Sequence, residues 1–121
     1  MDKNSNNKRY NLEDRTLKFT KNTRDFLKNI KKDISNLEYV KQVIRSSASI
    51  GANYIEANEC LGKKDFKMRI KISKKEAKET RYWLKLLDCN NEQNLEKRRA
   101  ELIQETNEFM KIFGAILEKS K

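Results

Sequence analysis

Residues 63–87, KKDFKMRIKISKKEAKETRYWLKLL, contain the repeat that decides the fold. Apolar or small residues recur there at alternating steps of four and three, namely Phe66, Ile70, Ser73, Ala77, Thr80, Leu84 and Leu87. This spacing places them on one face of an α-helix and favours packing against other helices at a shallow angle. The stretch therefore predicts a helix at about residues 63–88 with a continuous core face.

Three further segments carry similar repeats and predict helices at about residues 12–33, 36–60 and 92–119. Their predicted core faces are, in order, Leu12, Thr16, Phe19, Thr23, Phe26 and Ile30; Val40, Val43, Ile44, Ser47, Gly51, Tyr54 and Ile55; and Leu95, Arg99, Leu102, Thr106, Phe109, Phe113 and Ile116. Ser35 or Asn36 is the expected N-cap of the second helix.

The breaks between these segments are short, which favours antiparallel neighbours. We therefore expect an all-α, antiparallel up-down four-helix bundle over residues 11–121. A long helical hairpin that dimerises is the alternative. Residues 1–10 show no periodicity and are expected to form a flexible basic and polar tail.

The composition excludes several classes of protein. The 121 residues include no proline, three glycines and no histidine, which argues against an all-β fold and removes every histidine-dependent catalytic or metal site. Cys60 and Cys89 lie outside any C-x-x-C spacing, and the N-terminus lacks an apolar signal segment. We expect a cytoplasmic protein with reduced thiols that uses no metal or cofactor, spans no membrane and is not an enzyme.

Positive charge is concentrated in two parts of the chain. The net charge is +10, of which residues 1–33 carry +5 and residues 63–91 carry +6. Such an excess favours anionic partners, above all nucleic acid.

The cations of the third predicted helix are regularly spaced. Seven of them step by three and four along about 32 Å of helix, and we call them the basic stripe: Lys64, Lys67, Lys71, Lys74, Lys78, Arg81 and Lys85. Like charges at this spacing repel one another, so the helix does not need them for its own stability. We expect them to contact phosphates, with no interleaved aromatic residue to stack on bases. A solubilising face is the alternative.

The third helix also has a second set of apolar residues, Met68, Ile72, Trp83 and Leu86, which do not fit on its core face. A helix that is apolar on two faces buries the second against something. We expect these four residues to form a subunit interface, with a broad core face in a monomer as the alternative.

Two features of the second helix are interpreted as structural. The run of small residues at 46–53, which includes Gly51, predicts a close helix–helix contact, with a ligand-approach site as the alternative. Asn53 and Glu56 lie one turn apart, on or beside the packed face, and are expected to be structural polar residues. The carboxylates of this helix and the next are expected to form ion pairs, because lysines and arginines surround them.

The stretch VIRSSASIGANYIEA at residues 43–57 resembles the signature of a family encoded by open reading frames in the intervening sequences of 23S ribosomal RNA genes. Residues 14–19 (DRTLKF), 63–66 (KKDF) and 74–84 (KKEAKETRYWL) match as well, and the resemblance covers residues 11 to 118. It implies an antiparallel four-helix bundle that assembles as a homopentamer around a central channel, in bacteria, without known enzymatic activity. Gly62 departs from the pattern, since relatives often have serine there as the helix cap.

A similar fold is used by the accessory variability protein of diversity-generating retroelements, a basic pentamer that binds a reverse transcriptase and nucleic acid. The leading hypothesis is therefore a non-catalytic, basic oligomeric scaffold that binds nucleic acid, with RNA favoured, through the basic stripe. The alternative is an accessory subunit of a reverse-transcriptase complex. A metal- or thiol-dependent enzyme is a third hypothesis with little support.

Overall fold

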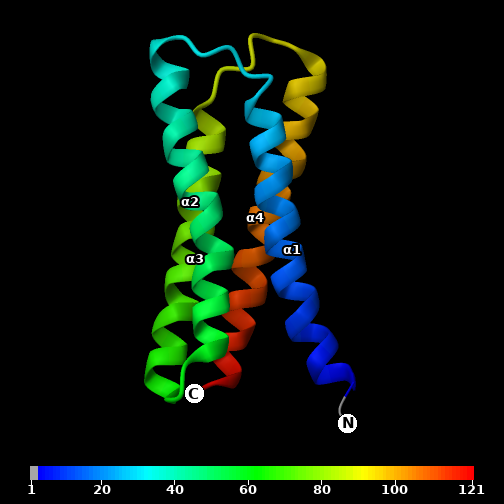
Figure 1. Ribbon diagram of the computed structural model, residues 1–121. Coiled ribbons are helices and arrows are strands. Elements are labelled where there is room, and N and C mark those ends of the chain that lie inside the picture. The colour runs from blue at the N-terminus through cyan, green and yellow to red at the C-terminus, as the bar shows by residue number, and fades with distance from the viewer. Residues whose placement is uncertain (1–2) are drawn as a thin grey trace.

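The computed structural model describes residues 3–121, with side chains described from Leu12 onward. This part of the chain forms four helices and no strands: α1 (Lys3–Leu27), α2 (Ile34–Glu59), α3 (Lys63–Leu86) and α4 (Gln93–Lys119). The helices run alternately up and down, so each is antiparallel to the next (Figure 1). The backbone of each helix lies close to those of its two neighbours around the bundle. The diagonal helices α2 and α4 meet through side chains in the core, where the ring centroids of Tyr54 and Phe113 are 5.9 Å apart. The expected antiparallel four-helix bundle is confirmed.

The bounds of α1 differ from the expected ones. The helix begins at Lys3, not near residue 12, so the backbone of the expected tail is helical from that residue on, while residues 1 and 2 lie outside the described part. The helix also ends at Leu27, well before residue 33. The chain then turns, and the amide of Ile30 donates to the carbonyl of Leu27 at 3.2 Å. Ile30 is still buried, as its place in the repeat predicted.

The residue that caps α2 is neither of the two expected ones. Asp33 is the N-cap, and its carboxylate accepts from the amide of Asn36 at 2.9 Å. Asn36 is fully buried at the end of the bundle, where it joins two loops. Its Nδ2 donates to the carbonyls of Lys31 at 2.8 Å and Asp88 at 2.9 Å, and its Oδ1 accepts from the amide of Asp88 at 3.0 Å. A buried amide with both ends bonded holds the α1–α2 and α3–α4 connections together.

Asparagines also shape the α3–α4 connection. Asn90 and Asn91 have φ angles of 54° and 60°, in the left-handed region that asparagine tolerates better than most residues. Arg99, expected on the core face of α4, is half-buried and donates to the carbonyls of Leu84 and Leu87 at the end of α3. A cation at this end of a helix satisfies carbonyls that have no partner within the helix.

The core combines aromatic rings of α1, α2 and α4 with aliphatic side chains of all four helices. Phe26, Phe109 and Phe113 are fully buried, and Phe19 packs edge to face on Phe109 with ring centroids 5.3 Å apart. Each buried side chain of this size contributes about 1.5–3 kcal/mol. On α3, the predicted core residues Ile70, Ser73, Ala77, Thr80 and Leu84 are all buried, as the repeat required.

The small residues of α2 let α1 and α3 approach closely. A Cβ on Gly51 would lie 2.8 Å from Thr16 Oγ1 and 3.0 Å from Thr16 Cβ, closer than side chains normally pack. The hydroxyl of Thr20 reaches across to the carbonyl of Ser47 at 3.1 Å. On the other side of α2, Ser73 Oγ donates to the carbonyl of Ile50 at 2.9 Å. The close helix–helix contact predicted for residues 46–53 is confirmed.

Candidate nucleic-acid interface

The basic stripe forms one continuous flank of α3. Lys64, Lys71, Lys78 and Lys85 are exposed, whereas Lys67, Lys74 and Arg81 are half-buried. Two of the half-buried members turn towards α4: Arg81 Nη1 donates to Asn107 Oδ1 at 2.8 Å, and Lys74 Nζ lies 3.7 Å from where a Cβ on Gly114 would stand. The two rows therefore run side by side, one facing solvent and the other beside α4.

None of the seven cations forms an ion pair with any carboxylate among residues 12–121, where side chains are described. Elsewhere in the bundle, some cations do pair with carboxylates. Arg15 on α1 makes two hydrogen bonds to Glu105 on α4, at 2.7 and 2.8 Å. Cations along the stripe are thus left available for an external anion.

The flank of α3 that faces α2 has the opposite character. Glu76 is buried there, with Arg45 Nη1 3.5 Å and Lys75 Nζ 3.9 Å from its carboxylate oxygens. Arg45 also donates to Glu79 at 3.1 Å. Burial, and then the nearby carboxylate of Glu79, raise the pKa of Glu76. The result is an ion-pair network between two helices, as expected for these carboxylates.

These carboxylates do not make a metal centre. Among residues whose side chains are described, no three acidic or cysteine residues come together closely enough to hold a metal ion. Cys89 is buried, and its burial raises the pKa of the thiol to about 11, so the nucleophilic thiolate is scarce near neutral pH.

The two residues expected to be structural and polar lie in different surroundings. Asn53 is half-buried; its Nδ2 donates to the carbonyl and the hydroxyl of Ser49, both at 2.9 Å, and its Oδ1 accepts from Arg69 of α3 at 3.0 Å. It therefore joins α2 to α3. Glu56 is exposed, so of the two expected positions, on or beside the packed face, it does not occupy the first.

The four residues expected at a subunit interface are only partly exposed to solvent. Met68 is 52 % exposed and Leu86 is 38 % exposed, whereas Ile72 and Trp83 are half-buried. The Trp83 ring stacks on Tyr39 of α2, with centroids 6.2 Å apart, and meets the edge of Tyr82 at 5.2 Å. Trp83 thus has partners within its own chain.

An exposed apolar surface also lies on α2. The sequence analysis did not predict one on this helix. Ile44 and Ile55, assigned above to the core face, are 51 % and 48 % exposed. With them, an exposed row we call the α2 apolar stripe runs along the helix: Ile34, Leu37, Ile44, Ala48, Ala52 and Ile55. The signal was present in the sequence, because these residues also recur at steps of three and four, broken by Lys41. The side of α2 that carries the small residues is buried instead of this row, because only small residues allow α1 to come close at Thr16.

Two hollows lie along α3, and each is lined in part by members of the basic stripe. One, of about 610 Å³, is lined by Lys63, Lys64, Lys67, Met68 and Lys71. The other, of about 580 Å³, lies nearer the C-terminal end of α3 and is lined by Arg45, Lys75, Lys78, Glu79, Tyr82 and Trp83. Tyr82 is 59 % exposed and stands one helical turn from Lys78 on one side and Lys85 on the other. An exposed aromatic ring therefore lies beside the row of cations, although none stands within the row itself.

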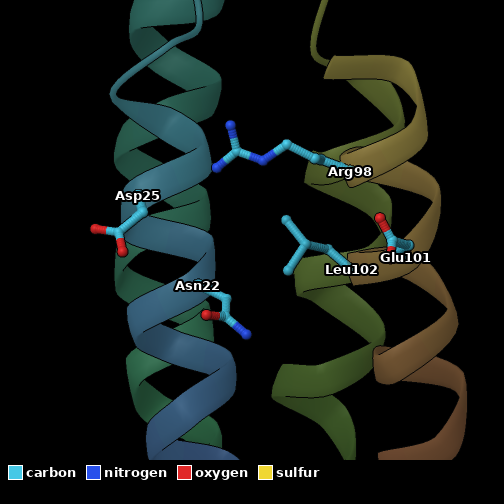
Figure 2. A pocket seen from close by; sticks show the side chains of 5 residues that line it. All are labelled: Asn22, Asp25, Arg98, Glu101 and Leu102. Carbon is cyan, nitrogen blue, oxygen red and sulfur yellow. The ribbon is translucent and has the colours of Figure 1, made fainter. Parts of the chain in front are cut away.

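The seam between α1 and α4 holds a smaller hollow, of about 260 Å³, shown in Figure 2. Arg98 reaches from α4 towards α1, with its guanidinium carbon 5.6 Å from the centre of the Phe26 ring, and Leu102 points the same way (Figure 2). Asp25 and Glu101 also line this hollow. Charges of both signs line this hollow, whereas the basic stripe carries charge of one sign.

Comparison with known proteins agrees with this architecture. The sequence profile of the 23S rRNA-intervening sequence protein family matches residues 8–115. The chain belongs to this family. A crystal structure of a protein of unknown function from the S23 ribosomal protein family of Bacteroides thetaiotaomicron superposes with a TM-score of 0.73 at 30 % identity, covering 87 % of this chain and 96 % of that one. No curated protein matches the chain.

Membership of this family places the bundle among proteins of related fold without assigning it a reaction. None of the four helices has an apolar stretch that could span a bilayer.

Proposed function

We propose that this 23S rRNA-intervening sequence protein is a non-catalytic, basic scaffold that binds RNA through its phosphates. The observation that carries the proposal is the set of seven cations on α3 that have no carboxylate partner among the described side chains. Unpaired like charges at i, i+4 destabilise a helix by a few tenths of a kcal/mol per pair. A polyanion removes that repulsion, and its binding releases the counterions condensed on it.

The test is a titration with labelled RNA over a range of salt concentrations. Each phosphate contact contributes about 0.7–0.9 to the slope of log affinity against log salt. Replacing Lys71, Lys74 and Lys78 with glutamine should lower that slope by about 2–3 and weaken binding to different sequences alike.

A matched control removes the same charge elsewhere. Lys21, Lys97 and Lys119 are exposed, lie on α1 and α4 and form no ion pair with the described side chains, so the triple glutamine variant of these three changes the net charge equally. It should keep the wild-type slope apart from a small long-range effect. A flat salt dependence in the wild type, or an equal loss in the control, would refute phosphate binding by the stripe.

We further propose that the scaffold acts as a homo-oligomer, a pentameric ring in the form the family resemblance implies. The α2 apolar stripe supports self-association, because an exposed row of this length, with Ile34 89 % exposed, is costly to leave in water. Native mass spectrometry at low and high salt tests it. Replacing Ile44 and Ile55 with glutamate should yield monomers, and a wild type that is monomeric at every concentration would contradict the ring.

The accessory subunit of a reverse-transcriptase complex remains the second candidate. The same α2 apolar stripe would then take a protein partner, while the basic stripe meets that partner's RNA. Co-purification with a reverse transcriptase that is lost in the Ile44 and Ile55 variant, but kept when the basic stripe is neutralised, would favour this role.

A further inference from the structure

The hollow around Tyr82 and Trp83 adds a second kind of contact to the basic stripe. We infer that it is a base-stacking site, and that the ligand of α3 is single-stranded nucleic acid. This inference rests on the proposed function, since it names the form of nucleic acid that the stripe would hold.

The first argument is the position of the aromatic rings. Tyr82 projects from the solvent face of α3 and is 59 % exposed, with Lys78 and Lys85 one turn away in either direction. A nucleotide whose phosphate is held by either lysine therefore has its base within reach of the tyrosine ring. Base–aromatic stacking does not depend strongly on sequence, because every base has a π-face.

The second argument is that the aromatic surface is already ordered. Trp83 is half-buried and stacked on Tyr39 of α2 at an interplanar angle of 30°, and it holds the edge of Tyr82 at 72°. The three rings come from two helices and already contact one another. They therefore lose little side-chain conformational entropy when a base binds. The aromatic surface is thus preorganised for stacking and does not depend on one mobile tyrosine.

The third argument concerns charge around the hollow. Lys78 has no carboxylate partner among the described side chains, and Lys75 has only one, 3.9 Å away. The carboxylate of Glu79 on the same rim is neutralised by Arg45 at 3.1 Å. An apolar protein partner seated here would bury Lys78 without a counter-ion, which is costly. A nucleotide supplies both a flat ring and an anion.

The geometry also selects single strands. In a duplex the faces of the bases are covered by their neighbours, so only phosphates, sugars and base edges are available. The second hollow of α3, around Met68, lies fourteen residues towards the N-terminus, about 21 Å along the helix. A flexible single strand can follow the lysines between the two hollows and place a base in each.

The test uses oligoadenylate RNA of roughly 12 nucleotides, within the site sizes typical of single-strand binders, and an RNA duplex of the same length. Trp83 is the one tryptophan of the chain, so fluorescence excited at wavelengths that tyrosine does not absorb reports on this hollow alone. We expect the single strand to quench Trp83 and the duplex to leave it unchanged. Tyr82→Ala should weaken single-strand binding roughly five- to 150-fold, whereas Tyr82→Phe, which keeps the ring, should bind like the wild type.

Leu17→Ala is the matched control, because Leu17 is a similarly exposed apolar residue (54 %) on α1, and it should bind like the wild type. If the single strand binds with the expected salt slope, but Trp83 is not quenched and Tyr82→Ala has no effect, the stacking site is refuted and phosphate binding stands. Equal binding of duplex and single strand without quenching refutes it as well. If neither RNA binds, the proposed function fails along with the inference.

Discussion

Two glycines in helix interiors provide a sharp test of the packing, because replacing each with alanine should change stability in opposite directions. Alanine is favoured over glycine in a helix interior by about 1 kcal/mol. At Gly114 of α4 a new Cβ would meet only Lys74 Nζ, at 3.7 Å, which is an ordinary contact with the end of a flexible side chain. Gly114→Ala should therefore stabilise the protein by up to about 1 kcal/mol.

At Gly51 the same change meets a rigid neighbour. The new Cβ would stand 3.0 Å from Thr16 Cβ, an atom fixed to the backbone of α1, so the two helices must move apart by a few tenths of an ångström. Overpacking of this kind costs about 1–3 kcal/mol, which exceeds the gain in helix propensity. We expect Gly51→Ala to lose about 1 kcal/mol in net stability.

The measurement is urea unfolding followed by circular dichroism, at one protein concentration for all variants because self-association shifts apparent stability. Thr16→Ala removes the closer of the two clashing atoms, so the Thr16→Ala, Gly51→Ala double variant should lose less than the sum of the single losses. If Gly51→Ala proves as stable as Gly114→Ala, the space between α1 and α2 at Thr16 is large enough for a methyl group, and the packing argument is refuted.

Further predictions concern buried polar groups. Asn36→Ala should cost about 3 kcal/mol in urea unfolding, because it leaves three backbone groups of two loops without partners. Thr23→Val should instead raise the unfolding midpoint, since the buried Thr23 hydroxyl has no hydrogen-bond partner; a fall would mean that the hydroxyl is satisfied. Because the pKa of Glu76 is raised on folding, the native state holds its proton more tightly than the unfolded chain, so wild-type stability should fall relative to Glu76→Gln as the pH rises from the ordinary carboxyl range through the raised value. Parallel curves for the two proteins would contradict this. With its thiol pKa near 11, buried Cys89 should react with a thiol reagent at pH 8 much more slowly than half-buried Cys60, as peptide mapping of the labelled protein can show.

The fold and the proposed function depend on different faces of the helices. The 46–53 run and the core repeats are what make the bundle, whereas the proposed RNA contacts use the solvent side of α3. The candidate site was therefore only partly visible from sequence. The seven cations of the stripe and their common flank follow from spacing alone. The exposed ring of Tyr82 beside them was not predicted, because its exposure depends on how α2 and α3 are rotated against each other.

Spacing along the chain was enough to determine four helices, their antiparallel order and the buried face of α3, because residues three and four apart must share a side of any α-helix. It could not decide the outcome where a helix offers two such sides. On α2 the stripe with Gly51 was buried, while the more apolar row with Ile44 and Ile55 faces solvent. Tertiary packing decides which side of α2 is buried. The α1 helix can come close to α2 only where α2 has no Cβ opposite Thr16, which is at Gly51. The cap at Asp33 and the buried position of Asn36 were decided in the same way, by hydrogen bonds to loops distant in sequence.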